Sequence, residues 1–280
     1  MSIPFSVRVA FLVLFCQLCI GGFLLASAPL PQPPSYHNFA DQRPLLGIPH
    51  MLNVVSNLPF LIVGLWGLIF MVSDKSRRPG IFLQPAERLP YFVYFVGLAL
   101  TAIGSAYYHA HPTNDRLTWD RMPLAITFMA LFTAVLAERL DWRFSTWLLG
   151  PLVALGIVSV VAWHFTETQE AGDMRFYLVV QFFPLIALPL LFVLFKPRYT
   201  GTADLVASLA CYGIAKGLEI LDARIYAQGG LVSGHTLKHL IAGLAAYFVL
   251  FMLQRRQPIE SRSSNRIPDE LFRLVDEAAR

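Results

Sequence analysis

The sequence predicts an all-α protein, a polytopic transmembrane helical bundle with seven core helices and one extra helix at its N-terminus. Of its 280 residues, 56% are hydrophobic and only 14% are charged, whereas soluble domains average about 25% charged residues. The charges cluster in short stretches between apolar runs, and each run is close to the ~20 residues that span a bilayer. One helical bundle therefore accounts for almost the whole chain.

Eight apolar segments follow one another along the chain. They lie at about 5–27, 52–72, 90–110, 120–138, 146–164, 175–195, 203–221 and 235–254. The sixth contains Pro184 and Pro189, which membrane helices tolerate when neighbouring groups satisfy the freed carbonyls. These segments divide the chain into an N-terminal membrane anchor or signal segment (1–29), an extracytoplasmic loop (30–51), a seven-helix domain (52–254) and a cytoplasmic tail (255–280). The end of the tail, 268–280, is expected to form an amphipathic surface helix.

The first segment has two interpretations. Ala26-Ser27-Ala28 resembles a signal-peptidase site, but Pro29 would follow the cut, and Arg8 is the only charge ahead of the apolar run. We favour a retained anchor. Cys16 and Cys19 form a C-x-x-C pair, but no charged or histidine neighbour would activate the thiols, so we expect inert packing.

The basic residues predict the orientation. Eleven Lys and Arg residues fall on one side of the predicted membrane and five on the other, which places the first side, with both termini, in the cytoplasm. No basic stripe interleaved with aromatics appears, so a nucleic-acid partner is not expected. The sequence carries no signal for oligomeric partners.

The seven histidines all fall at or near the extracytoplasmic face on this topology. His235 and His239 are four residues apart, so both imidazoles lie on one helix face and can reach one ion. His109 ends the third segment at the matching depth. Zinc needs nitrogen ligands and, in catalytic sites, an open position for water. The other histidines are His37, His50, His111 and His164.

Two further polar residues fall at the same depth. Ser105 lies four residues before His109, and Asp120 opens the fourth segment after a turn at 111–118. Singly, each has a structural explanation, because an aspartate often caps a helix and a membrane serine often bonds to a backbone carbonyl. Ionisable residues inside a span cost ~2.5–3.5 kcal/mol each, so their shared depth favours a common site.

At these residues the chain resembles the alkaline ceramidase family, part of a superfamily of seven-helix membrane hydrolases that also contains progestin and adiponectin receptors. Three blocks carry the resemblance in the family's order. They are Asn53-Val54-Val55-Ser56-Asn57-Leu58, then Gly104 to His109 with Asp120-Arg121-Met122-Pro123, and His235-Thr236-Leu237-Lys238-His239 with the Gly243-Leu244 that follows.

The resemblance implies a zinc ion held by His109, His235 and His239, with Asp120 and Ser105 assisting hydrolysis of the amide of ceramide or a related N-acyl lipid. Asp120 would move the proton, and Ser105 would donate a hydrogen bond to the oxyanion or the water. Asn53, Ser56, Asn57 and Lys238 are possible supporting residues. An acyl chain would lie between helices, near residues such as Phe92, Phe95, Phe128 and Phe182, although plain packing is the favoured role of these aromatics.

Several positions depart from the family pattern. Arg121 replaces a Glu, and Lys238 replaces an aromatic residue. His50 stands where the family's calcium site has a Glu, which argues against calcium as a second cofactor. Lys216, Glu219 and Asp222, spaced three apart, are expected to form a buried ion-paired ladder rather than a substrate contact.

Two alternative functions stay open at this point. A lipid ester hydrolase or remodelling enzyme could use the same metal site, and a receptor-like bundle could hold zinc without catalysis. A purely structural zinc usually has four protein ligands, which argues against the second. A membrane lipid is the expected partner in the first two cases.

Overall fold

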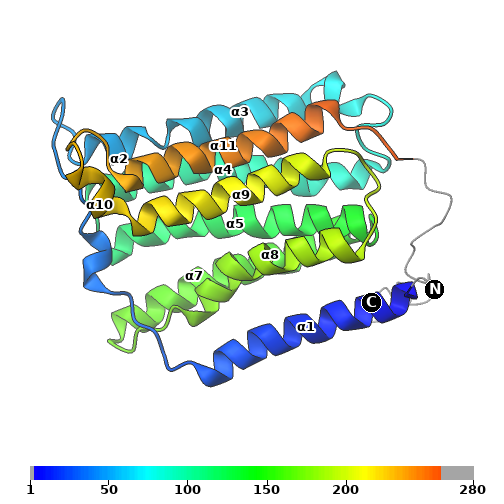
Figure 1. Ribbon diagram of the computed structural model, residues 1–280, viewed down its shortest axis with the longest axis horizontal. Coiled ribbons are helices and arrows are strands. Elements are labelled where there is room, and N and C mark those ends of the chain that lie inside the picture. The colour runs from blue at the N-terminus through cyan, green and yellow to red at the C-terminus, as the bar shows by residue number, and fades with distance from the viewer. Residues whose placement is uncertain (1–2, 260–280) are drawn as a thin grey trace.

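The long helices of the protein run side by side as one bundle (Figure 1). The computed structural model describes residues 3–259, and this part of the chain is all-α. Seven of its helical segments are long and apolar enough to cross a membrane. They are α1 (Phe5–Ala26), α2 with α3 (Met51–Val55 and Leu58–Val72), α4 (Arg88–Ala110), α5 (Asn114–Arg139), α6 with α7 (Phe144–Trp147 and Leu149–Thr168), α8 (Arg175–Leu194) and α11 (Gly234–Arg255). The predicted polytopic helical bundle is confirmed, and the chain is an integral membrane protein.

The remaining predicted span forms a helix of a different character. Helix α9 (Thr202–Ile220) is followed directly by the short α10 (Asp222–Ala227). Because α9 carries Asp204, Lys216 and Glu219, it is not among the seven apolar helices. It nevertheless packs along α11 inside the bundle. Asp204 and Glu219 of α9 form ion pairs with Arg255 and Lys238 of α11. Contact with α11, rather than apolar composition, therefore holds α9 in the bundle.

The predicted helix 52–72 is broken near its start. Helix α2 ends at Val55 and α3 begins at Leu58. Pro59 has no backbone N–H, so the Val55 carbonyl cannot receive the usual helical hydrogen bond from it. Ser56 and Asn57 lie buried at the break, and Ser56 contacts His239 in the second turn of α11.

Helix α5 begins earlier than the sequence indicates. Thr113 is its N-cap and accepts a hydrogen bond from the Arg116 backbone N–H at 3.3 Å. The predicted turn over 111–118 is therefore wrong beyond residue 113, because the Thr cap starts the helix at Asn114. Asp120 lies in the second turn of α5 instead of opening the helix.

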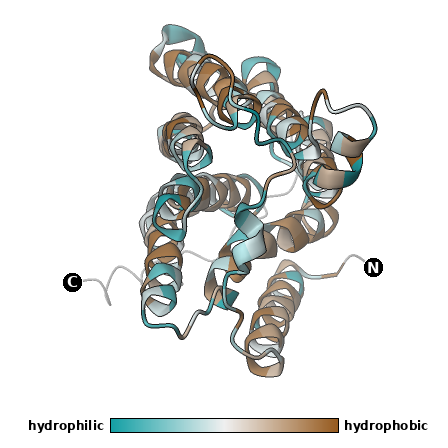
Figure 2. Ribbon diagram, turned by 90° about the vertical axis from the view of Figure 1, so that its left-hand side faces the viewer, coloured by the Kyte–Doolittle hydropathy of each residue, from teal (hydrophilic) through white to brown (hydrophobic). Residues whose placement is uncertain are grey.

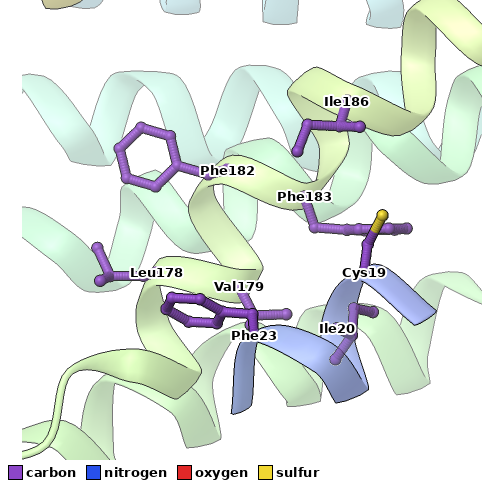
Figure 3. A pocket seen from close by; sticks show the side chains of 8 residues that line it. All are labelled: Cys19, Ile20, Phe23, Leu178, Val179, Phe182, Phe183 and Ile186. Carbon is purple, nitrogen blue, oxygen red and sulfur yellow. The ribbon is translucent and has the colours of Figure 1, made fainter. Parts of the chain in front are cut away.

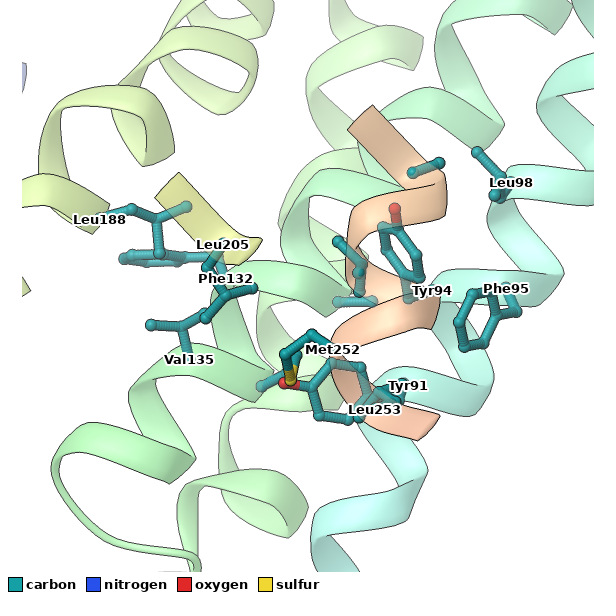
Figure 4. Close-up of a cluster of buried hydrophobic side chains, with 14 of the residues drawn as sticks. Tyr91, Tyr94, Phe95, Leu98, Phe132, Val135, Leu188, Leu205, Met252 and Leu253 are labelled. Carbon is teal, nitrogen blue, oxygen red and sulfur yellow. The ribbon is translucent and has the colours of Figure 1, made fainter. Parts of the chain in front are cut away.

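The core of the bundle joins side chains from α4, α5, α8, α9 and α11, as the labelled residues of Figure 4 show. Helices α4 and α5 approach most closely beside Gly104. A Cβ atom at Gly104 would lie 2.0 Å from the Trp119 carbonyl oxygen. A glycine is therefore required at this position, one residue from Ser105 and one turn from His109.

Helix α1 stands at the edge of the bundle and packs on α8 (Figure 1). Polar contacts tie its ends: Arg8 donates to the Leu194 carbonyl at 2.6 Å, and Arg175 donates to the Ser27 carbonyl at 2.5 Å. Between these ties an apolar groove separates the two helices, lined by residues such as Phe23 and Phe182 (Figure 3). The three cysteines are free. Retention of α1 as an anchor stays a prediction.

The two ends of the bundle carry its polar residues. Seen from the end where α2 and α10 lie, hydrophilic residues gather on the loops and helix ends, while hydrophobic residues dominate the helix bodies (Figure 2). The loop between α1 and α2 crosses this end and contains a short 3-10 helix, Pro34–His37. The predicted surface helix at 268–280 lies outside the described residues.

Candidate metal centre and adjoining cavities

Three buried histidines meet at this end of the bundle. His109 comes from the last turn of α4, and His235 and His239 come from the first two turns of α11. One ring nitrogen of each lies within 4.8 Å of the others, which makes them a possible metal-binding group. The three are at most 4% exposed. The structure therefore brings together the three predicted ligands, while their binding of zinc stays a prediction.

The donor set fits a small tetrahedral ion. The Nε2 atoms of His109 and His235 are 3.3 Å apart. Two nitrogens bound to zinc at ~2.0–2.1 Å in a tetrahedral arrangement would be separated by about 3.3–3.4 Å. The rings meet edge to face at centroid distances of 4.8–4.9 Å. Within residues 3–259, the buried Nδ1 of His109 has no hydrogen-bond partner.

Ser56 orients the third histidine. Its hydroxyl lies 2.8 Å from Nδ1 of His239, which leaves Nε2 of that ring as the nitrogen available to an ion. Asn53, one turn earlier, accepts a hydrogen bond from the Thr236 hydroxyl at 2.9 Å and so links α2 to α11. Asn57 donates to the Asn53 carbonyl at 2.8 Å. Of these three residues, Ser56 contacts a ligand histidine directly, as residues that orient metal ligands do. The supporting role of all three stays a prediction.

A phenyl ring from the loop covers the histidines. Phe39 is 4% exposed, and its ring centroid lies 4.7 Å from that of His109 and 4.5 Å from that of His235. Asp222 accepts hydrogen bonds from the backbone N–H groups of Ala40 and His235, at 2.9 and 2.7 Å. It thereby fastens this loop to the start of α11. No sequence pattern indicated that Phe39 takes part.

The predicted charged ladder forms only in part, and its residues are half-buried. Glu219 pairs with Lys216 on its own helix and with Lys238 on α11, the second contact being 2.6 Å long. Nζ of Lys238 also lies 3.3 Å from Nε2 of His235. Asp222 is the exception, because it binds the backbone N–H groups described above instead of joining the ion pairs.

A polar cavity adjoins the histidines, and Ser105 and Asp120 line it together with His239, Glu219 and Lys238. The Ser105 hydroxyl interacts with the Asp120 carboxylate. Asp120 is half-buried and is not one of the grouped metal-binding residues. This arrangement places a carboxylate and a hydroxyl beside the candidate metal centre without using them as ligands.

A second, apolar cavity continues from the first toward the middle of the bundle. Phe60, Leu124, Tyr212 and Ala242 line both. Of the four aromatics expected near an acyl chain, only Phe128 lines the inner cavity within the described residues. The other three lie elsewhere: Phe95 is buried in the core, Phe92 is partly exposed, and Phe182 lines the groove beside α1.

Four histidines lie outside the group. His37 bonds to the Tyr108 hydroxyl at 2.9 Å and to the Asn114 side chain at 3.0 Å, which secures the 3-10 turn of the loop. His50 caps α2 in a left-handed conformation. His111 is exposed, and His164 lies 3.8 Å from Asp115. The sequence predicted all seven histidines near one face of the membrane. These four lie at the same end of the bundle as the group of three but do not belong to it.

Comparison with known proteins adds no assignment to this geometry. No family model matches the chain, and no curated protein matches it significantly. The candidate site therefore stands on the residues described above.

Proposed function

We propose that this protein is a zinc-dependent intramembrane hydrolase that cleaves the amide bond of ceramide or a related N-acyl lipid and releases a fatty acid and an amine base. The observation that carries the proposal is the group of three buried histidines beside a cavity that is polar next to them and apolar deeper in the bundle. An N-acyl lipid has the same order of groups, an amide head followed by an acyl chain.

His109, His235 and His239 would hold the zinc ion, with Ser56 fixing the ring of His239. When bound, the ion would supply Lewis-acid polarisation of the substrate carbonyl and activation of water. A three-ligand site keeps a coordination position open, as catalytic zinc sites do.

Asp120 and Ser105 would act on protons in the polar cavity. A carboxylate oxygen of Asp120 would accept a proton from the attacking water and return it to the leaving nitrogen of the amide, which is general acid–base catalysis. The Ser105 hydroxyl, which interacts with that carboxylate, would hold it in place or donate to the carbonyl oxygen as negative charge develops there.

The inner cavity would take the acyl chain. Its lining is almost entirely apolar, with residues such as Leu98, Phe128 and Leu188. Burying each CH₂ group there would contribute about 0.8 kcal/mol. On the charge bias of the loops, the site would face the extracytoplasmic side and the C-terminus the cytoplasm.

The first experiment measures zinc per chain in detergent-purified wild type and in His235→Ala, together with fatty acid release from a panel of ceramides and of N-acyl lipids with anionic head groups. About one zinc per chain, lost in His235→Ala along with activity, is the expected result. His111→Ala is the matched control, because this exposed histidine is close to His109 in sequence but outside the group.

Other outcomes would redirect or end the proposal. Release of fatty acid from ester lipids but not from amides would favour the ester hydrolase. Zinc without hydrolysis of either class would favour a receptor-like protein. Wild type purified without chelators that contains no zinc would overturn the metal site and the mechanism with it.

A further inference from the structure

Arg121 is a buried arginine whose surroundings do not satisfy it. It is 5% exposed and follows Asp120 on α5. The guanidinium group stacks on Trp163 at 4.1 Å and on Tyr177 at 4.6 Å from the ring centroids. One nitrogen, Nη2, donates to the Gln32 side chain at 2.5 Å, but Nη1 is buried and has no hydrogen-bond partner in the described part of the chain.

Arg121 forms no ion pair within residues 3–259, and the Asp120 carboxylate next to it in the sequence acts on it only through longer-range electrostatics. The polar cavity that it lines also contains Lys216, Lys238, Glu219 and Asp120. Three cationic groups against two carboxylates leave one surplus positive charge, before any zinc is bound. A buried charge without a partner is costly, so this surplus predicts that an anion completes the site.

The position of Arg121 defines which part of a ligand it would contact. It lines the same cavity as Ser105, Asp120 and His239, whereas the apolar cavity leads away toward the middle of the bundle. An anion at Arg121 would therefore lie on the head-group side of the candidate reaction centre, opposite the acyl chain. Tyr36 lines this region too, and its phenol interacts with the Arg121 guanidinium. Desolvation raises the pKa of this phenol, so Tyr36 remains neutral and does not balance the charge of Arg121.

We infer that the lipid taken by this cavity carries an anionic oxygen group, a carboxylate or a phosphate, on its head side, and that Arg121 binds that group. The guanidinium fork suits both, since planar donors pair with two oxygens of either anion. The inference narrows the substrate class of the proposed hydrolase and rests on it for the bond that is cleaved, but the binding step can be measured without catalysis.

A purely structural role is the competing explanation. Gln32 belongs to the loop over the bundle end, so Arg121 could simply hold that loop. That role uses Nη2 and leaves Nη1 and the surplus charge unexplained. It also predicts no difference between anionic and neutral ligands of the same shape, which the following experiment measures.

The experiment compares ligands that cannot be hydrolysed, bound to the full-length wild-type protein in nanodiscs and followed by calorimetry. Dodecyloxyacetate carries the carboxylate, dodecyl phosphate carries the phosphate, and 2-dodecyloxyethanol is the neutral match of the first. We expect at least one anion to bind roughly tenfold or more tightly than the alcohol, because charge-assisted hydrogen bonds are the stronger ones. Whichever of the two anions binds more tightly shows whether the site prefers a carboxylate or a phosphate head group.

Three variants assign the preference to Arg121. Arg121→Gln should remove it, and Arg116→Gln should retain it, because Arg116 lies on the same helix but stacks on Tyr107 outside the cavity. Gln32→Glu keeps Arg121 and supplies an internal carboxylate, so it should weaken anion binding even if Arg121→Gln fails to fold. Equal wild-type affinity for the alcohol and both anions, or a preference that persists in Arg121→Gln, would overturn the inference while leaving the hydrolase proposal standing.

Discussion

The two ends of the bundle both bury charged side chains, but they treat them differently. At the end away from the histidines, Glu138 forms an ion pair with Arg256. Glu138 also accepts a hydrogen bond from the Tyr91 hydroxyl at 2.7 Å. Glu87 pairs there with Arg198 at 2.8 Å. Each carboxylate has its guanidinium. Arg139 is also buried at that end without an ion pair among residues 3–259, but its two terminal nitrogens donate to the Phe195 carbonyl and the Thr202 hydroxyl. At the histidine end, three imidazoles and Arg121 are buried without an ion pair to a carboxylate in the same part of the chain.

We interpret the paired charged side chains as groups that stabilise the fold, and the unpaired ones at the histidine end as groups available to bind a ligand. A matched buried pair needs nothing more, so its removal should affect stability alone. Unpartnered buried polar atoms cost free energy in the folded protein. They occur at both ends, for example Nη2 of Arg256 at one and Nη1 of Arg121 at the other, but in the described residues only the histidine end combines them with a polar cavity and a candidate metal group. The contrast therefore supports placing function at one end, and each prediction below tests it.

Asp120→Asn should have the largest effect on activity. The amide cannot accept and return a proton, so we expect hydrolysis to fall by about 10²–10⁴-fold with zinc content unchanged, because Asp120 is not one of the grouped histidine ligands. Fatty acid release and bound metal are measured on the same samples. Asp115→Asn is the control, since this aspartate lies on the same helix but is 84% exposed. Unchanged turnover in Asp120→Asn would remove the aspartate from the mechanism.

Glu138→Gln should have the largest effect on stability. Removing the carboxylate leaves the Arg256 charge buried and unpaired, which costs about 3–5 kcal/mol in comparable buried pairs. We expect a lower temperature of unfolding in detergent, with near-wild-type zinc content in the molecules that remain folded.

The double variant Glu138→Gln with Arg256→Met provides the control. It removes both charges together, so much of the lost stability should return. If the double variant is no more stable than Glu138→Gln, the pair does not act as a matched structural unit, and the contrast between the two ends fails.

Ser56→Ala should weaken the metal centre without destroying it. Loss of a hydrogen-bond partner behind a ligand histidine typically lowers metal affinity by about 10–100-fold, and Ser56 is the partner of His239. Zinc affinity is measured by competition with a chelator of known strength. Ser73→Ala, at the far end of α3, removes a hydroxyl bonded only to the backbone and should leave the affinity unchanged. Equal affinities in the two variants would exclude this orienting role.

The candidate metal group could be predicted from the sequence because local helix geometry determines much of it. The spacing of His235 and His239 puts both on one face of α11, and the topology puts His109 at the same end. The helical break after Val55 was missed although Pro59 signals it, because hydropathy alone joins the two halves into one apolar run. Likewise, the Thr113 cap was passed over in favour of the apolar boundary of α5.

The surroundings of Arg121 could not be predicted from the sequence in this way. The sequence shows an arginine directly after Asp120, but not what faces it. Trp163 comes from α7, Tyr177 from α8 and Gln32 from the loop, and no spacing rule joins three segments so far apart. The same holds for Phe39, whose contact with the histidines depends on the path of a long loop across the bundle.

The smallest predicted effect concerns a matched pair at the histidine end itself. Asp41, in the loop, pairs with Arg43 at 2.8 Å, and this hydrogen-bonded guanidinium lowers the pKa of the Asp41 carboxyl. Because the pKa is lowered by folding, the pair stabilises the protein above the ordinary aspartate pKa of ~3.9, and the stabilisation is lost as the pH falls through the native value.

Asp41→Asn should therefore unfold at a slightly lower temperature than wild type at neutral pH, and the difference should close in acid. Arg43→Gln removes the same pair from the other side and should reproduce this pH dependence. Thermal unfolding in detergent from pH 7 downward measures both. Zinc content should be equal in all three proteins at neutral pH, because a matched pair beside the metal group serves only to hold the loop. A fall in zinc content in either variant would mean that the Asp41–Arg43 pair also contributes to the metal site. Structural and ligand-binding charged groups would then both occur at the histidine end, instead of being separated between the two ends of the bundle.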